Sequence, residues 1–207
     1  ASPDEIIFTA CGTESDNTAI RSALEVLPDR RHIITSRVEH PAVLTQCRNL
    51  TAKGYRVTEI GVDSAGRLDM DEYKKAIDDD TAIVSFMWAN NETGVIFPVE
   101  EAAAIAKANG AQFHTDAVQA VGKIPINMAA SKIDMLSLSG HKLHAPTGIG
   151  ALYVRKGTPY RPLLVGGHQE RSRRAGTENA AAIIALGKAC QLAGQFMEAE
   201  NTTVKAK

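Results

Sequence analysis

The sequence contains the run Ile133-Asp134-Met135-Leu136-Ser137-Leu138, followed at once by Ser139-Gly140-His141-Lys142. An apolar run of this length that ends at a glycine is typical of a buried strand leading into a turn. Lys142 would then leave the sheet at its edge, where open α/β sheets bind ligands. A partly desolvated lysine shifts its pKa readily and can form a Schiff base with an aldehyde, although a lysine after a strand is also commonly a solvated turn residue. The rest of the chain decides between these interpretations.

Strand-like and helix-like segments alternate on both sides of this run. We expect strands at 6–9, 32–38, 55–60, 81–88, 111–117, 133–139 and 150–155, and helices at 14–27, 41–53, 69–77, 98–109 and from 178 onward. The Pro- and Gly-rich segment 158–168 indicates a loop or an edge strand. Such alternation is typical of βαβ units with right-handed crossovers. The sequence therefore predicts one three-layer α/β/α sandwich with a mostly parallel sheet over residues 1–207.

Composition excludes several classes of partner. The chain has 207 residues and a formal net charge of −1, which gives no reason to expect a polyanion partner. The one dense basic cluster is Arg171, Arg173 and Arg174. Without interleaved aromatic residues this cluster is more typical of a solvated face than of a nucleic-acid site. No uninterrupted apolar stretch approaches the roughly 20 residues that span a bilayer, so we expect no membrane segment.

The cysteine pattern bears on the cellular compartment of the protein, and the N-terminus bears on the extent of the chain. Cys11, Cys47 and Cys190 are odd in number and far apart, with no Cys-x-x-Cys spacing. This pattern argues against a disulfide framework or a structural zinc site, and it favours a reducing compartment, which we take to be the cytoplasm. The chain has no signal-like N-terminus. It lacks an initiator Met and begins almost at a strand, so we expect an excised segment.

Polar residues that follow the expected strands are the candidate site residues, because strand ends meet at one edge of such a sheet. Gly12-Thr13 stands where a helix begins, and Thr13 either caps that helix or helps its free N–H groups bind a phosphate. His40 precedes Pro41 at another strand-to-helix junction, where it is either structural or catalytic. Asn90-Asn91 are either turn formers or site residues.

Asp116 is an acid at the end of an apolar strand, so it must be paired or hydrogen-bonded if it is buried. It either caps the following helix or serves a partner that stays protonated, such as a pyridinium nitrogen. Gln119 lies one helical turn further on, and His141 is either an acid–base group or a turn residue. His114 shares a strand face with Asp116 but has no clear third ligand, so we expect no metal.

Other common motifs are absent. The sequence has no Gly-x-Gly-x-x-Gly after the first strand, no Walker-type Gly-Lys-Ser/Thr, no Gly-x-Ser-x-Gly and no His-Glu-x-x-His. Dinucleotide, P-loop, serine-hydrolase and zinc-protease interpretations are therefore poor.

Taken together, these segments resemble the pyridoxal-phosphate (PLP) domain of the cysteine desulfurases, most closely the nitrogen-fixation (NifS-type) branch. The matching strings run in family order through nearly the whole chain. They are Phe8-Thr9-Ala10-Cys11-Gly12-Thr13-Glu14-Ser15-Asp16-Asn17, Val38-Glu39-His40-Pro41-Ala42, Asn90-Asn91-Glu92-Thr93-Gly94, His114-Thr115-Asp116-Ala117-Val118-Gln119, Ser139-Gly140-His141-Lys142, Gly167-His168-Gln169-Glu170 and Arg173-Arg174-Ala175-Gly176-Thr177-Glu178-Asn179.

The resemblance implies the large domain of PLP fold type I and a role for each matching residue. Lys142 and His40 would be the catalytic residues, with Lys142 bonded to the cofactor's aldehyde and His40 stacked on its ring. Asp116 would pair with the pyridinium nitrogen. Gln119 and Asn91 would lie near the phenolic oxygen and the substrate. The phosphate would be held by Thr13, Ser139 and His141, and the phosphate of a neighbouring subunit by Thr177, which implies a homodimer.

The resemblance also implies a reaction. The full enzyme would convert L-cysteine to L-alanine and an enzyme persulfide, and would pass the sulfur to a scaffold protein for iron–sulfur cluster assembly of the nitrogenase type. Lys142 must then be partly deprotonated when free, which we expect burial and the nearby cofactor to arrange. Alternatives are a selenocysteine lyase, another fold-type I PLP enzyme, or a PLP-binding or structural domain without turnover.

The chain also departs from the family. The family's persulfide cysteine and its carboxylate-binding arginine lie downstream of this chain's end, and none of the three cysteines matches the persulfide position. The family's N-terminal segment is missing too. Ala145 and Thr147 stand where relatives usually have Gly and Lys, and Gly12 stands where Ala is commoner. We therefore expect residues 1–207 to be the PLP-binding large domain, inactive without its small domain.

Overall fold

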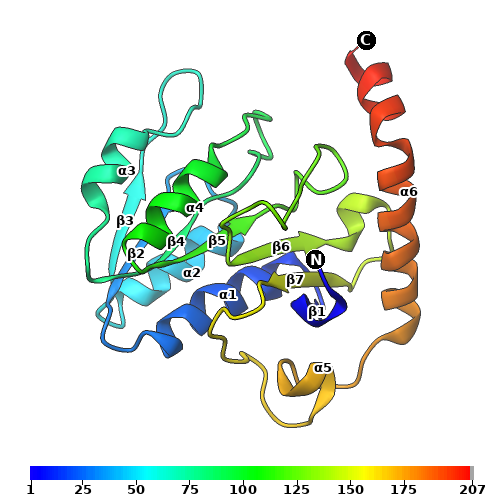
Figure 1. The fold of residues 1–207 in the computed structure, drawn as a ribbon, viewed down its shortest axis with the longest axis horizontal. Coiled ribbons are helices and arrows are strands. Elements are labelled where there is room, and N and C mark those ends of the chain that lie inside the picture. The colour runs from blue at the N-terminus through cyan, green and yellow to red at the C-terminus, as the bar shows by residue number, and fades with distance from the viewer. Residues whose placement is uncertain (206–207) are drawn as a thin grey trace.

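The computed structural model describes residues 1–205, in which seven strands form a single sheet with helices on both faces (Figure 1). The strand order is β1-β7-β6-β5-β4-β2-β3. The strands are β1 (Ile6–Thr9), β2 (His32–Ser36), β3 (Arg56–Ile60), β4 (Thr81–Ser85), β5 (Gln112–Asp116), β6 (Met135–Ser139) and β7 (Gly150–Val154). The helices are α1 (Gly12–Val26), α2 (Pro41–Thr51), α3 (Met70–Ala76), α4 (Val99–Ala108), α5 (Gln169–Ser172) and α6 (Ala180–Lys205), with 3₁₀ helices η1 (Pro3–Glu5) and η2 (Gly140–Leu143).

The sheet is mostly parallel, as the alternation of elements predicts. The pairs β2–β3, β2–β4, β4–β5 and β5–β6 are parallel, whereas β7 runs antiparallel to both β6 and β1. A parallel neighbour requires a long crossover, and only a short segment joins η2 to β7. The short connection therefore reverses the chain direction at β7.

The helices divide into two layers because successive strand residues point to opposite faces of a sheet. Ile33 and Ile83 pack on one face with α1 and α2, and Ile34 and Val84 pack on the other face with α3 and α4. All four side chains are fully buried, and each such burial contributes roughly 1.5–3 kcal/mol. The three-layer α/β/α prediction is confirmed.

The boundaries differ from the expectation mainly at strand ends. The strands expected at 32–38 and 81–88 stop at Ser36 and Ser85, and residues 158–168 form no strand. Beyond Ser85 the chain still lies against β5, because the N–H groups of Phe86 and Trp88 donate to the carbonyls of His114 and Asp116. The apolar run in the sequence thus predicts which residues are buried, but it does not predict the residue at which the strand ends.

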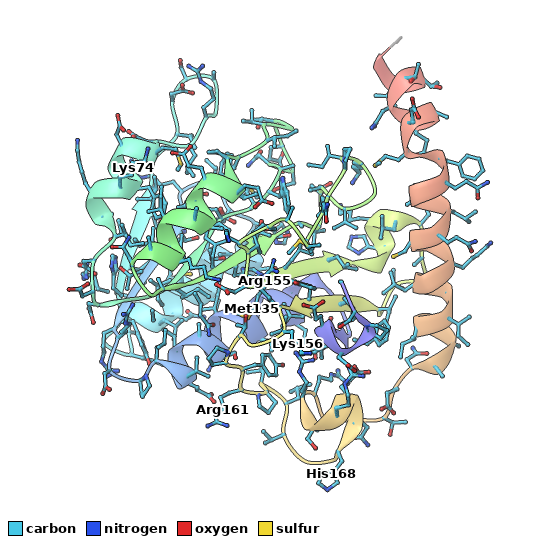
Figure 2. All side chains as sticks on the ribbon, in the orientation of Figure 1. Lys74, Met135, Arg155, Lys156, Arg161 and His168 are labelled. Carbon is cyan, nitrogen blue, oxygen red and sulfur yellow. The ribbon has the colours of Figure 1, made fainter. Side chains whose placement is uncertain are left out.

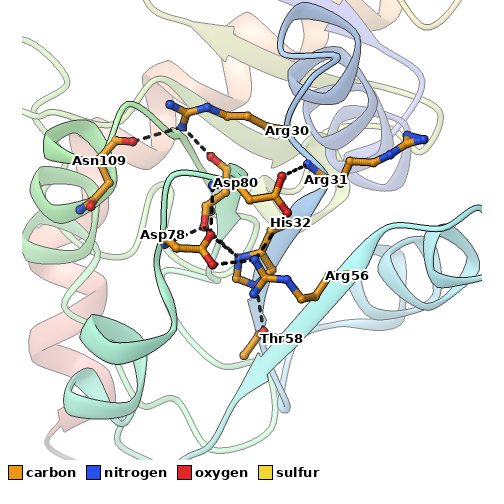
Figure 3. A network of polar contacts seen from close by, with 9 residues as sticks. Arg30, Arg31, His32, Arg56, Thr58, Asp78, Asp80 and Asn109 are labelled. Carbon is orange, nitrogen blue, oxygen red and sulfur yellow. Dashed lines mark hydrogen bonds and ion pairs between the residues drawn. The ribbon is translucent and has the colours of Figure 1, made fainter.

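A polar network holds the edge where the parallel strands begin (Figure 3). His32 at the start of β2 is buried, and its Nδ1 and Nε2 lie 2.9 and 2.8 Å from the hydroxyls of Thr81 and Thr58. Arg30 donates to the carbonyl oxygens of Thr81 and Asn109, which joins the start of β4 to the end of α4. The network fixes this edge, and the opposite edge carries the candidate site residues.

Helix α6 stands beside the sheet, and its C-terminal part extends away from it (Figure 1). Leu186 packs with Leu143 and Ala151, which joins the helix to η2 and β7. Within residues 1–205, α6 is also the helix that is long and apolar enough to cross a bilayer, by length and composition alone. This is weak evidence for a membrane segment, because core helices of soluble proteins pass the same test, and Lys188 interrupts the apolar run of α6.

Candidate active site

A cavity of about 210 Å³ opens at the edge of the sheet where the parallel strands end. The segments that surround it are the start of α1, the residue before α2, the loop after β4, the turn after β5 and η2. It is lined by Cys11, Gly12, Thr13, Asp16, His40, Ala42, Met87, Ala89, Asn91, Asp116, Val118, Gln119, Ser139, His141 and Lys142. Every site residue implied by the resemblance is among them except Thr177.

The N-terminus of α1 gives one side of the cavity the character of an anion site. Cys11 precedes the helix without a side-chain cap, so the first N–H groups stay available together with the positive end of the helix dipole. A Cβ on Gly12 would come within 2.9 Å of Val118 Cγ2, so glycine allows a close approach here. Beside Gly12, Ser139 Oγ and His141 Nδ1 are hydrogen-bonded at 2.9 Å. Thr13, Ser139 and His141 thus add hydroxyl and imidazole groups beside these free N–H groups.

Asp116 ends β5 and is 7% exposed. The N–H of Val118 donates to its Oδ1 over 2.9 Å. Burial raises the pKa of Asp116, whereas the Val118 N–H and the nearby His40 lower it. The carboxyl group lies in the cavity wall, where it can meet a protonated ring nitrogen.

His40 is the N-cap of α2, and its Nδ1 accepts a hydrogen bond from the N–H of Ala42 over 3.1 Å. In the neutral ring this contact assigns the proton to Nε2. The side chain is exposed at the cavity mouth. The structural and functional interpretations of His40 therefore both apply, since the cap holds the imidazole at the cavity.

Lys142 lies in η2 and lines the cavity, but it is exposed. The partial burial that we expected for its amine is therefore not provided by this chain alone. Its neighbour Lys123 does not line this cavity but lines another one together with Lys142. Lys123 Nζ donates to Gln119 Oε1 over 3.2 Å, and burial together with the charge of Lys142 lowers the pKa of Lys123.

The two asparagines of the loop after β4 have different roles. Asn90 is buried, and its Oδ1 accepts hydrogen bonds from the N–H groups of Glu92 and Thr93. Its Nδ2 donates to the carbonyl of Val38, which fixes the loop to the segment before α2. Asn91, by contrast, is exposed and lines the cavity. Asn90 is thus the turn former and Asn91 the candidate site residue.

Thr177 lies outside this cavity, in the wall of a second one of about 200 Å³ between β1 and the start of α6. A bidentate ion pair from Arg174 to Glu14, at 2.8 and 3.1 Å, holds this segment against α1. The preceding α5 segment has three consecutive left-handed residues, Glu170 to Ser172. His168 lies at its tip and points away from the body of the protein (Figure 2).

Cys11 and Asp16 line the main cavity, although the motifs in the sequence assigned no role to either residue. Asp16 could have been found, because it follows Thr13 by three residues on a helix and so shares its side. Cys11 directly precedes the Gly12-Thr13 pair. All three cysteines are free thiols in the structure, and burial raises the pKa of Cys47 to about 12.

Comparisons with known proteins place this geometry in a family. The family model described as aminotransferase class-V matches residues 1–207. The cysteine desulfurase NifS of Azotobacter vinelandii is 62% identical over 202 residues, which is 98% of this chain and 50% of that protein. A cysteine desulfurase of Gluconacetobacter diazotrophicus is 65% identical over 203 residues, covering 98% of this chain and 51% of the relative. The chain thus spans about half the length of the curated relatives it matches.

Solved structures agree. A NifS-like protein superposes with a TM-score of 0.92 at 43% identity, covering 96% of this chain and 55% of that chain. The structure titled SspA in complex with cysteine superposes with a TM-score of 0.88 at 40% identity, covering 92% of this chain and 56% of its own. The chain belongs to the aminotransferase class-V family.

Proposed function

We propose that residues 1–207 are the PLP-binding large domain of a cysteine desulfurase that converts L-cysteine to L-alanine and an enzyme persulfide. The observation that carries the proposal is the cavity, in which an amine, an acid, an imidazole and a helix N-terminus converge. The family and the names of the relatives support the same cofactor and reaction. The neighbour described as being in complex with cysteine supports the substrate.

The residues present fit PLP group by group. The uncapped α1 N-terminus with Thr13, Ser139 and His141 suits its phosphate. Asp116, with one oxygen held by the Val118 N–H, suits the pyridine nitrogen. Lys142 suits the aldehyde, and the flat imidazole of His40 suits a ring face.

PLP, when bound, supplies an electron sink for the bonds at the substrate's α carbon. Lys142 Nζ would hold the cofactor's aldehyde carbon and, when free, would carry protons to and from the substrate. The Asp116 carboxylate would keep the pyridine nitrogen protonated. Gln119 and Asn91 would orient the phenolic oxygen and the substrate. His40 would fix the plane of the ring and exclude water from that face.

The proposal extends to partners. We place Thr177 at the phosphate of a second subunit, in a homodimer. The persulfide cysteine is assigned to the part of the relatives that this chain does not cover, since none of the three cysteines stands at the position that the resemblance implies. Cys11 directly precedes α1 in the cavity wall, Cys47 is buried, and Cys190 lies on α6 away from the cavity. The sulfur acceptor is an iron–sulfur scaffold protein, and the compartment is the cytoplasm.

A cofactor titration tests the proposal. PLP added to the protein should give an absorbance band at a longer wavelength than that of free PLP. Borohydride should then fix the cofactor covalently on Lys142, which peptide mass spectrometry would detect. Lys142→Ala should lose both signals. Lys156→Ala is the matched control, because Lys156 is exposed beyond the end of β7 and lies outside the cavity (Figure 2). An unchanged spectrum with folded protein would contradict the proposal.

Two alternatives remain separable by experiment. Full-length protein supplied with cysteine and with selenocysteine would distinguish a desulfurase from a selenocysteine lyase. Persulfide formation by the 207-residue chain alone would contradict the assignment of the persulfide cysteine to the uncovered half. PLP binding without turnover at full length would support a domain without catalytic activity.

A further inference from the structure

Asp16 is a buried acid that lines the same cavity as Asp116. Its side chain is 2% exposed, yet its Oδ1 has no hydrogen-bond partner within residues 1–205. An ionised carboxylate in such a place costs several kcal/mol unless a cation or several donors compensate it. The surroundings of Asp16 therefore decide its protonation state.

Strand β5 presents two ionisable groups to Asp16. Nε2 of His114 lies 3.6 Å from Asp16 Oδ1. His114 is not a cation, because burial lowers its pKa to about 3 and its ring nitrogens already contact the hydroxyls of Ser85 and Ser137. The second group is Asp116, whose charge raises the pKa of Asp16.

His40 and Lys142 line the same cavity, but within residues 1–205 neither is among the groups that shift the pKa of Asp16 most. Glu39, from the segment before α2, and Cys11, at the start of α1, both raise the pKa of Asp16. The Ser137 hydroxyl of β6 lowers it, but burial is the larger effect and raises it well above the ordinary value. The groups that act on Asp16 are thus acids, a thiol, a hydroxyl and a neutral imidazole.

Asp116, unlike Asp16, has neighbours that stabilise its charged form. The backbone N–H of Val118 donates to its Oδ1, and His40 favours its charged form. Two carboxyl groups that share one site do not both ionise readily, and the proton stays on the group with fewer donors.

We propose that Asp16 holds a proton at neutral pH and acts as a positioning residue, leaving Asp116 as the single charged carboxylate that faces the cofactor's ring nitrogen. The inference rests on the proposed function, since it assigns the pyridine nitrogen to Asp116. It adds that the acid pair supplies one negative charge, not two, and that Asp16 acts through Asp116 without bonding the cofactor itself.

Infrared spectroscopy of the full-length protein tests the proton directly, with or without cofactor. A protonated carboxylic acid has a C=O stretch that its amide replacement lacks. Asp16→Asn should lose one such band at pH 7, and Asp116→Asn should retain it. Glu39→Gln is the matched control, because burial raises the pKa of Glu39 to about 8 and its band should disappear independently.

Loss of the band in Asp116→Asn but not in Asp16→Asn would overturn the proposal, as would the absence of any acid band beyond that of Glu39. If Asp16→Asn does not fold, the Asp116→Asn spectrum still decides, because burial has a larger effect on Asp16 than the charge of Asp116 and should keep its band. PLP titration adds a second readout: Asp116→Asn should weaken binding at least about tenfold more than Asp16→Asn. Failure of the wild-type protein to bind PLP would contradict the proposed function and leave the infrared result standing.

Discussion

At the scale of single residues, Gly12 sets how closely α1 approaches the turn after β5. A side chain at this position would meet Val118 Cγ2 at 2.9 Å and Ser139 Cβ at 3.4 Å. Both neighbours belong to the cavity wall. An alanine at this position would therefore need a compensating shift at Val118 to fit here.

We expect Gly12→Ala to lower the free energy of unfolding by about 1–3 kcal/mol, because the added methyl overpacks the contact with Val118. In a Val118→Ala background the same change should cost less. Chemical denaturation of the four proteins measures the difference. Gly187→Ala on α6 is the control, because nothing lies within 4 Å of its added Cβ. It should be neutral or stabilising, and an equal loss at both glycines would contradict the prediction.

At the scale of elements, the segment from α5 to α6 is held by polar contacts more than by packing. Glu170 to Ser172 adopt left-handed backbone, which persists only where contacts enforce it. The Phe8 N–H donates to Glu170 Oε2, and Arg171 donates to the carbonyls of Pro3 and Ile6. With the Arg174–Glu14 pair, these contacts place Thr177 near β1.

We expect Arg174→Lys to loosen this segment, because lysine cannot reproduce the bidentate contact with Glu14. Hydrogen exchange of residues 169–179 should become several-fold faster, which corresponds to roughly 1 kcal/mol. Arg161→Lys is the control, since Arg161 is exposed and points into solvent (Figure 2). Unchanged exchange in Arg174→Lys would show that packing, and not the ion pair, holds the segment.

The burial of side chains also varies along the length of helix α6. Its buried side chains, Ala182, Leu186 and Ala189, lie in the first half, whereas Phe196 and Val204 are exposed. We expect amide hydrogens of residues 194–203 to exchange faster than those of 184–193, because helices gain most of their stability from packing. Helix α1, with buried residues along most of its length, is the internal reference. Uniform protection along α6 would contradict this.

At the scale of the whole molecule, buried ionisable groups make stability depend on pH in opposite directions. His114 binds a proton less readily when folded, with a pKa of about 3 against 6.5, so its contribution is present above pH 6.5 and is lost as pH falls. Burial also lowers the pKa of His32, so His32 likewise contributes less to stability as the pH falls. Glu39, with a pKa raised from 4.5 to about 8, stabilises the fold below pH 4.5 and loses that contribution as pH rises.

We expect the His114→Asn variant to show a weaker decline of Tm than the wild type between pH 6.5 and 4. Each group contributes at most about 1.4 kcal/mol per pH unit. The Glu39→Gln variant should instead show a steeper decline on acidification, because an opposing contribution is removed. His168→Asn is the control, since His168 is exposed at the tip of α5 (Figure 2). Parallel pH profiles in all variants would contradict the assignment.

The sequence by itself determined the order of strands and helices and the edge at which the site lies. Apolar runs and helix-start signals are local, and strand ends meet at one edge by geometry, so Asp116, Ser139 and Lys142 could be placed together in advance. Only the tertiary structure decided that Asp16 and Cys11 join them, that β7 is antiparallel and that Lys142 is exposed. These features depend on distances and burial between segments far apart in the chain, and periodicity along a single segment carries no information about them.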